Sequence, residues 1–355
     1  MIIAGGTGGH VMPALAVARY LRQQGKIVHW LGTHAGIEAR VVPAENFPIS
    51  FIDIQGVRGK SLLTLLLAPF KILKAIFQSW RVLASVRPNA VLCMGGYVCG
   101  PAAIAAWLMR CPIVLHEQNA IAGWTNRVLA NIASRVMVAF PQAFATRKNV
   151  IETGNPVRQD ILTILPPVER LSARQSQVRV LVLGGSQGAT KLNEALPQAL
   201  ALLPLEKRPL VWHQTGKNNL DATKKGYEEH GIIAQVSDFI QDMQEAYNWA
   251  DIVICRSGAL TIAEICAVGL PSILIPFPYA VDDHQTYNAK YLSDQGAAYL
   301  LKQSVLTPLI LSELILDLID HPQKRLAMAM ASHALAKPLA TTIVAEQCLE
   351  VSCES

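Results

Sequence analysis

Two stretches, MIIAGGTGGH at residues 1–10 and VRVLVLGGSQGA at residues 178–189, share one design. Each is a short apolar run followed by a glycine-rich turn, and a helical pattern follows each turn. Glycine lets backbone N–H groups face a ligand, and the N-terminus of the next helix adds positive potential, which suits phosphate. Two such turns about half a chain apart predict two similar lobes that face one phosphate-bearing substrate across a cleft.

Apolar strand-like runs alternate with helical patterns along the chain, which is typical of parallel α/β layers. Strands are predicted at Ile27–Leu31, Ala90–Met94, Pro112–Leu115, Val136–Val138, Val178–Leu183, Leu210–His213, Ala250–Cys255 and Ser272–Ile275. Helices are predicted between them at Ala14–Gln24, Ala102–Leu108, Lys191–Leu203 and Leu260–Val268. The pattern predicts two Rossmann-like domains, residues 1–157 and 158–335, joined near GNPV at residues 154–157.

The two halves differ in charge. Residues 1–157 hold 15 Lys and Arg against 5 Asp and Glu, a net charge of +10. Residues 158–355 hold 16 Lys and Arg against 21 Asp and Glu, a net charge of −5. The two halves together give the net charge of +5 of the whole chain. A basic first half indicates an anionic partner: nucleic acid, an anionic membrane surface or a phosphorylated substrate. An uneven solvated surface without a partner is the plainer alternative.

One segment, from Lys60 to Arg87, departs from the α/β pattern. Leu73, Ile76, Phe77 and Trp80 recur at helical spacing, whereas Lys71, Lys74, Gln78 and Arg81 fall on a different face. This pattern predicts an amphipathic helix that lies on a membrane surface; a helix that covers the sheet is the alternative. The longest apolar run, residues 62–70, is shorter than the roughly 20 residues of a membrane span, and no signal peptide pattern opens the chain. We therefore expect a cytoplasmic protein.

Several common sites are not indicated. A dinucleotide fingerprint from Gly6 would need glycine at Val11, and a P-loop ending at Ser61 would need glycine at Ile54. The seven cysteines form no CxxC pair, and no Asp-x-Asp sequence occurs. We therefore expect no tightly bound cofactor and no essential metal, although a divalent cation could stimulate the reaction.

Further turns follow the predicted strands. They are GGYVCGP at 95–101, HEQN at 116–119, GNPVR at 154–158 and RSGALTIAE at 256–264. Loops at the carboxyl ends of parallel strands gather at one edge of a sheet, so these turns should share a cleft. The residues alone indicate a two-domain enzyme that binds a nucleotide diphosphate.

Together with GGTGGHV at 5–11 and GGSQG at 184–188, these motifs resemble the MurG family of bacterial glycosyltransferases from Gly5 to about Gln347. The resemblance implies a GT-B fold: α/β, with two Rossmann-like doubly wound parallel-sheet domains facing a cleft. A C-terminal helix at about 336–355 would pack back on the first domain. The first domain would bind acceptor and membrane, and the second UDP-GlcNAc.

The resemblance also implies an activity. N-acetylglucosamine would pass with inversion from UDP-GlcNAc to the 4-hydroxyl of the MurNAc unit of undecaprenyl-linked lipid I. The product, lipid II, serves peptidoglycan synthesis and hence cell shape and division. The protein would be peripheral, on the cytoplasmic face of the inner membrane. It would bind an anionic membrane surface and no nucleic acid, with other cell-wall synthesis proteins as candidate partners.

Carried over residue by residue, the family's donor site holds residues from both halves. They are Thr7, Gly8, Gly9, Asn119, Arg158, Ser186, Ile240, Ala259, Leu260, Thr261, Ile262, Ala263, Glu264 and Gln285. Taken alone, Glu264 is better explained as a carboxylate that complements a helix dipole, but the resemblance implies that it binds the ribose hydroxyls. Ser186 and the helix behind it would hold the diphosphate, Ile240 would contact uracil and Gln285 the transferred sugar. The acceptor and its diphosphate would bind at Gly95, Gly96 and Tyr97.

Transfer needs a base for the acceptor hydroxyl. His10 ends the first glycine-rich turn and suits base catalysis near neutral pH, so we expect it to be catalytic, with Glu117 as the competing candidate. A phosphate or acceptor contact is the alternative role for His10. The Ser186 turn, with Arg158 or Arg256, would stabilise departing UDP. A UDP-GlcNAc 2-epimerase-like enzyme and a membrane-associated nucleotide-sugar-binding protein stay open as alternative functions.

Overall fold

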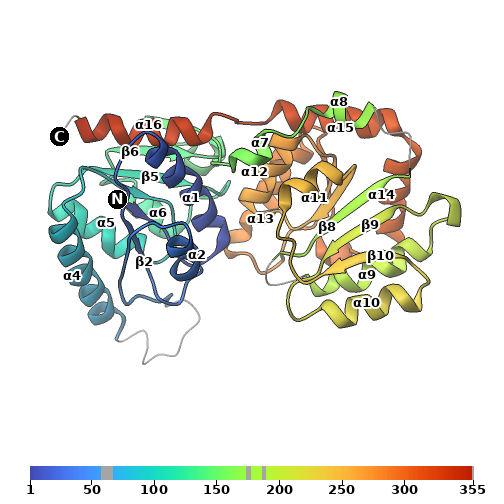
Figure 1. Cartoon of the computed structure of the whole chain (residues 1–355), viewed down its shortest axis with the longest axis horizontal. Helices are drawn as coiled ribbons and strands as arrows, with labels where there is room; N and C mark the ends of the chain where they lie inside the picture. Colours follow the sequence, from blue (N-terminus) through green and yellow to red (C-terminus); the bar gives the residue numbers. More distant parts are fainter. Residues whose placement is uncertain (57–66, 173–176, 186–188, 354–355) are drawn as a thin grey trace. The chain divides into compact units, whose positions relative to one another are not determined.

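The computed structural model describes residues 1–56, 67–172, 177–185 and 189–353 (Figure 1). The chain divides into two compact units. The first comprises Met1–Val157 and Pro338–Ser355, and the second comprises Arg158–Lys337. Each unit is built on one parallel sheet with helices, as the sequence predicts.

The sheet of the first unit has seven strands in the order β3-β2-β1-β4-β5-β6-β7, and every pairing is parallel. The strands are β1 (Ile2–Ile3), β2 (Trp30–Gly32), β3 (Ile49–Phe51), β4 (Val91–Cys93), β5 (Ile113–Glu117), β6 (Arg135–Val138) and β7 (Val150–Glu152). The helices are α1 (Gly8–Gln23), α2 (Glu38–Ala44), α4 (Ala68–Val86), α5 (Cys99–Leu108), α6 (Trp124–Leu129), the 3-10 turn η1 (Pro141–Phe144) and α16 (Ala340–Cys353).

Both faces of this sheet are covered. Successive residues of a strand face opposite sides, so Ile2 and Ile3 of β1 enter different cores. Ile2 packs with α1 and with Val344 and Val351 of α16, and the two helices are in contact (Figure 1). Ile3 packs in the core that α4 and α5 cover. A segment at the far end of the chain therefore completes the first unit.

The second unit has six parallel strands in the order β10-β9-β8-β11-β12-β13. The strands are β8 (Arg179–Leu183), β9 (Leu210–Gln214), β10 (Ala234–Ser237), β11 (Ile252–Cys255), β12 (Ser272–Leu274) and β13 (Ala298–Leu300). The helices are α7 (Gln159–Leu162), α8 (Pro167–Ser172), α9 (Thr190–Ala201), α10 (Leu220–Glu229), α11 (Met243–Trp249), α12 (Ala259–Val268), α13 (His284–Ser293), α14 (Pro308–Asp320) and α15 (Pro322–Ala334). Short 3-10 turns lie at η2 (Leu205–Lys207), η3 (Val281–Asp283) and η4 (Gln303–Val305).

The predicted strands are confirmed in the middle of each sheet, but all four edge strands were missed. They are β3, β7, β10 and β13, which bound the two sheets. Most of their residues are only half-buried, so they lack the continuous apolar run by which a strand buried on both faces is recognised. The apolar pattern of this sequence therefore predicts the interior strands but not the edge strands.

The helix after the first glycine-rich turn begins earlier than predicted. The prediction began it at Ala14, whereas α1 begins at Gly8 and contains Pro13. Because proline favours the first turn of a helix, Pro13 suggested a helix start near Ala14, which is too late. Gly8, Gly9 and His10 consequently form the first helical turn, and His10 does not end a loop.

Two buried histidines belong to the sheets. On β9, His213 Nδ1 lies 2.9 Å from the Tyr227 hydroxyl and Nε2 lies 3.1 Å from the Asn193 side-chain oxygen. Burial lowers the pKa of His213 from 6.5 to about 3. On β5, His116 Nε2 donates to the Gly154 carbonyl at 3.0 Å, and burial lowers its pKa to about 4. Both side chains are neutral in the folded protein at neutral pH.

These histidines should make the fold sensitive to acid. From pH 6.5 down to about 4 the unfolded chain binds protons that the folded chain does not, so the free energy of unfolding falls as the pH is lowered. For His213 the loss between pH 7 and pH 5 is about 2 kcal/mol. Urea unfolding of His213→Gln should show a correspondingly smaller difference between the two pH values. The exposed His230→Gln should keep the wild-type difference, and an unchanged difference in both His213→Gln and His116→Gln would contradict this assignment.

Candidate functional site

Each glycine-rich turn lies where the strand order of its own sheet reverses. The order reverses between β1 and β4 in the first unit and between β8 and β11 in the second. Doubly wound sheets bind ligands outside the carboxyl ends of strands at such points. Gly5–Gly9 follows β1 and Gly95–Gly96 follows β4, while Gly184–Gly185 follows β8 and Arg256–Gly258 follows β11. These four turns are therefore at the expected ligand-binding position of each sheet, whereas the predicted turns at 116–119 and 154–158 lie at the ends of β5 and β7.

The first turn ends in an open helix N-terminus. Thr7 caps α1 in an extended conformation (φ −102°, ψ 162°), and its side chain makes no capping hydrogen bond. Gly8 is half-buried and Gly9 exposed, and the first turn of α1 carries no acidic residue. Backbone N–H groups at such an end attract anions.

A buried carboxylate, Glu38, holds this turn in place. It is the first residue of α2 and is fully buried. Oε2 accepts a hydrogen bond from the Gly6 N–H at 2.9 Å, and Oε1 accepts from the N–H and the hydroxyl of Thr33 at 2.9 and 2.8 Å. A Cβ at Gly5 would lie 2.6 Å from Glu38 Oε1. Glu38 was not predicted from the sequence, where the available signal was a glutamate shortly after Gly32 and Gly36.

The turn after β4 packs directly on the first turn. Gly95 and Gly96 have φ of +105° and +90°. A Cβ at Gly95 would lie 2.3 Å from His10 Nδ1, and one at Gly96 would lie 2.3 Å from the Gly5 carbonyl oxygen. Only glycine fits at these two positions. Tyr97, the third residue of the predicted acceptor site, is largely exposed.

The side chain of Gln118, just beyond β5, completes this group. Its Nε2 donates to the Met94 carbonyl at 2.5 Å, and its Oε1 lies 3.2 Å from His10 Nδ1. Gln118 is buried, whereas His10 is half-buried. Gln118 belongs to the HEQN motif, but no role for it was predicted from the sequence.

Glu117 and Asn119 form a separate hydrogen-bonded loop. The buried Glu117 carboxylate accepts from the Asn119 N–H and side-chain amide through Oε1, at 2.9 and 3.3 Å. Through Oε2 it accepts from the Gly123 N–H at 3.1 Å and the Asn126 amide at 2.8 Å. Each oxygen already accepts two hydrogen bonds, so this carboxylate orders the chain that leads into α6.

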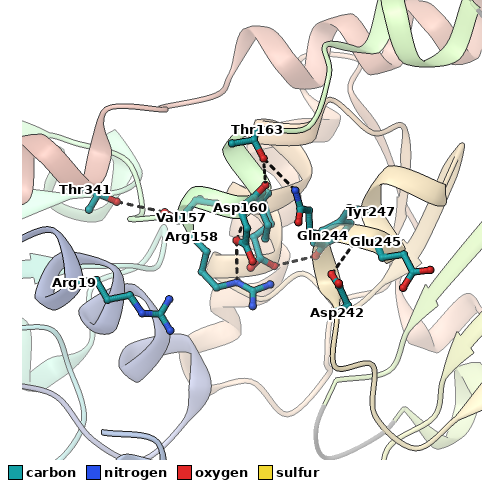
Figure 2. Close-up of polar contacts among 12 residues, drawn as sticks. Arg19, Val157, Arg158, Asp160, Thr163, Asp242, Gln244, Glu245, Tyr247 and Thr341 are labelled. Carbon is teal, nitrogen blue, oxygen red and sulfur yellow. Dashed lines mark hydrogen bonds and ion pairs between the residues drawn. The ribbon is translucent and has the colours of Figure 1, made fainter. Parts of the chain in front are cut away.

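In the second unit, the predicted residues 259–264 form the start of α12. Gly258 caps this helix in an extended conformation (φ −64°, ψ 143°). Glu264 is buried, and the Tyr247 hydroxyl donates to its Oε2 at 2.9 Å. Burial raises the pKa of Glu264 to about 7, against the opposing charge of Arg158. Figure 2 shows Arg158, Tyr247 and Asp160 in this part of the unit, with Arg158 Nε 3.7 Å from Asp160.

The other predicted donor residues of this unit are spread over several loops. Ile240 is buried and donates its N–H to Gln214 Oε1 at 3.1 Å. Gln285 Oε1 accepts the Phe277 N–H at 2.9 Å, and the Gln285 carbonyl accepts the Ser257 hydroxyl at 2.7 Å, which joins α13 to the end of β11. Arg256 donates to the carbonyls of Ile275 and Pro276. Ser186 lies outside the described residues.

Helix α4 presents an exposed apolar strip, which we define as Phe70, Leu73, Phe77 and Trp80. The Phe77 and Trp80 rings stack with centroids 6.1 Å apart. Ala75, Ser79 and Leu83 of the same helix are buried in the unit. Ile76, predicted on the lipid face, packs instead against the core, because helical spacing places it on the same face as the buried Ser79 and Leu83. Residues 60–66 of the predicted amphipathic segment lie outside the described residues.

The described part of the chain contains neither a metal-ligand cluster nor a membrane-spanning helix. No group of three or more His, Cys, Asp or Glu in residues 1–56, 67–172, 177–185 and 189–353 could hold a metal ion. No helix in those same ranges is long and apolar enough to cross a membrane.

Comparisons with known proteins cover nearly the whole chain. The glycosyltransferase family 28 N-terminal domain matches residues 1–138, and the C-terminal domain of that family matches residues 179–343. Relatives from Marinobacter nauticus and Stutzerimonas stutzeri are 51% and 49% identical over 99% of this chain and 97% and 98% of theirs. Both are named UDP-N-acetylglucosamine--N-acetylmuramyl-(pentapeptide) pyrophosphoryl-undecaprenol N-acetylglucosamine transferase.

A solved structure agrees with these relatives. MurG of Acinetobacter baumannii is 42% identical, covers 99% of both chains and superposes with a TM-score of 0.84. The GT-B fold expected from the sequence is thereby confirmed. The chain belongs to glycosyltransferase family 28 and, within it, to the MurG family.

Proposed function

We propose that this enzyme transfers N-acetylglucosamine from UDP-GlcNAc to the MurNAc 4-hydroxyl of lipid I and so forms lipid II. The observation that carries the proposal is the match to transferases of that name at about half identity over 99% of the chain. The same match favours transfer over the epimerase and the non-enzymatic binder. The open helix N-terminus at Gly8 and the start of α12 are suited to the phosphates and nucleoside of such a donor.

Transfer with inversion requires one proton acceptor. The acceptor oxygen attacks the anomeric carbon, the bond from that carbon to the UDP oxygen breaks, and the hydroxyl proton passes to a base. We favour His10 over Glu117 as this base. Both Glu117 oxygens are occupied by four N–H donors, whereas His10 Nε2 hydrogen-bonds no other described residue.

The remaining assignments follow the family resemblance. Glu264 would accept the ribose hydroxyls, Ile240 would contact uracil and Gln285 would contact the sugar through its amide nitrogen. Arg158 and the helix behind Ser186 would stabilise the departing diphosphate. These positive groups make an essential metal unnecessary, although a divalent cation could stimulate. Gly95, Gly96 and Tyr97 would face the acceptor.

The exposed apolar strip of α4 supports a membrane-bound location. Lys71 and Arg81 are exposed beside the strip, and Lys74 pairs with Asp53 at 2.9 Å. Aromatic side chains flanked by basic ones bind the interface of anionic bilayers. We therefore propose peripheral binding to the cytoplasmic face of the inner membrane, where the lipid-linked acceptor would be.

The first experiment tests transfer and the base together. Labelled GlcNAc should pass from UDP-GlcNAc to a short-chain lipid I analogue only when the analogue is present. His10→Ala should lower kcat by about 10²–10⁴-fold with little change in UDP-GlcNAc affinity, because a general base acts in the transition state. The exposed His230→Ala is the control. Turnover of free UDP-GlcNAc without acceptor would favour the epimerase, and a kcat within a few-fold of wild type would exclude His10 as the base.

A second experiment concerns the pH dependence of donor binding. The Glu264 carboxyl has a pKa of about 7 and must be ionised to accept two ribose hydroxyls, so UDP-GlcNAc affinity should rise about tenfold from pH 6 to pH 8. Binding near pH 7 should release a proton to the buffer. The binding enthalpy measured by calorimetry should therefore vary with the ionisation enthalpy of the buffer. Glu264→Gln should bind more weakly and lose both effects, whereas the exposed Glu206→Gln should retain them. A flat profile in the wild type would contradict the assignment.

The membrane proposal predicts lipid binding through α4. Phe77→Ser/Trp80→Ser should bind vesicles of phosphatidylglycerol and phosphatidylethanolamine at least about tenfold more weakly than wild type, because two large apolar side chains no longer leave water. Vesicle sedimentation measures this, and high salt should weaken the remaining binding. The exposed Leu205→Ser, in the other unit, is the control. Equal binding of all three proteins would exclude the strip as the contact surface.

A further inference from the structure

The geometry points to Gln118 as a positioning residue that selects the tautomer of His10. A neutral imidazole carries its proton on either Nδ1 or Nε2, and only the other nitrogen can accept a proton. Which nitrogen carries the proton depends on the hydrogen bond that each one makes. Gln118 makes the one such contact with His10 among the described residues.

The orientation of the Gln118 amide follows from its other partner. The Met94 carbonyl oxygen, 2.5 Å away, can only accept a hydrogen bond, so the amide nitrogen must face it. A flipped amide would place two oxygens against each other in a buried site, since Gln118 is 1% exposed. The Gln118 oxygen is therefore the atom that faces His10.

The tautomer of His10 follows in turn. Gln118 Oε1 is an acceptor 3.2 Å from His10 Nδ1, so the ring must carry its proton on Nδ1. Nε2 then holds a free lone pair, and the half-buried ring leaves that nitrogen without a partner among the described residues. Gln118 thus presents Nε2 as the proton acceptor.

The His10 ring has little room to move away from Gln118 Oε1. A Cβ at Gly95 would lie 2.3 Å from His10 Nδ1, which shows how closely the backbone after β4 approaches the same edge of the ring. Met94, the partner of Gln118, immediately precedes Gly95. One short stretch of backbone therefore fixes both the amide and the imidazole. Being neutral, the amide also orients the ring without a negative charge that would favour the imidazolium.

Nuclear magnetic resonance of ¹⁵N-histidine-labelled protein tests the tautomer directly. At a pH where His10 is neutral, the wild type should show a protonated Nδ1 and an unprotonated Nε2. Gln118→Met has similar length and no amide, so His10 should move toward the Nε2–H form that predominates in free histidine. His29, which contacts the Ser50 hydroxyl through Nε2, is the internal control and should not change. A wild-type His10 protonated on Nε2 would overturn the proposal.

Kinetics supply the second measurement. Gln118→Met should lower kcat about 5- to 50-fold with the KM for UDP-GlcNAc within about twofold, because fewer molecules hold the competent tautomer. Gln118→Asn is too short to reach both the Met94 carbonyl and His10, so it should lower kcat similarly. It also tests the proposal if the methionine variant does not fold. Unchanged kcat in a folded variant would overturn the proposal.

The catalytic consequence rests on the proposed transfer reaction, but the spectrum does not. If the wild type transferred no sugar, the proposed function would fail while the tautomer measurement still decided the role of Gln118.

Discussion

The site of the first unit depends on the close packing of two backbone turns that leave no room for side chains. The turn after β4 lies against the turn after β1 so closely that a Cβ at Gly96 would meet the Gly5 carbonyl. A Cβ at Gly95 would meet His10, and one at Gly5 would meet Glu38. Glu38 is buried and the Gly5 carbonyl is part of the backbone, so neither can give way cheaply. Glycine at positions 5 and 96 therefore lets the two turns pack together, and glycine at position 95 leaves room for the imidazole of His10.

Buried polar side chains also position the site. The number of hydrogen bonds that a buried carboxylate already accepts distinguishes one that holds the backbone from one that can bind a ligand. Glu38 accepts two backbone N–H groups and the Thr33 hydroxyl, and Glu117 accepts two backbone N–H groups and two side-chain amides. These hydrogen bonds satisfy carboxylates that burial would otherwise make costly. Among the described residues, Glu264 accepts one hydrogen bond, from the Tyr247 hydroxyl, and burial raises its pKa to about 7. A carboxylate with spare acceptor capacity can take a ligand's hydroxyls, and a saturated one cannot. The same comparison distinguishes His10, with one engaged nitrogen, from Glu117.

The sequence was informative where burial is continuous or a motif is local. Interior strands such as β8 read as apolar runs because both faces are covered, whereas edge strands such as β10 do not. The family resemblance placed some of the site residues, such as Thr7 and Ala259, next to the switch points of the two sheets, and their individual roles stay predictions. Glu38 and Gln118 were missed because their roles depend on Gly6 and His10, which lie 32 and 108 residues away from them in the sequence. No local pattern encodes such contacts.

Helix α16 belongs to the first unit although it is synthesised after the second unit. It contributes Val344, Ala345 and Val351 to the core beneath α1, and Thr341 donates a hydrogen bond to the Val157 carbonyl at the end of the first unit (Figure 2). Domains generally fold as their residues leave the ribosome, the N-terminal one first. Here the α1 face of the first unit stays uncovered until the whole second unit has been synthesised. The domain that begins first is thus the last to close its core, and a growing chain must keep that apolar face from other contacts in the meantime.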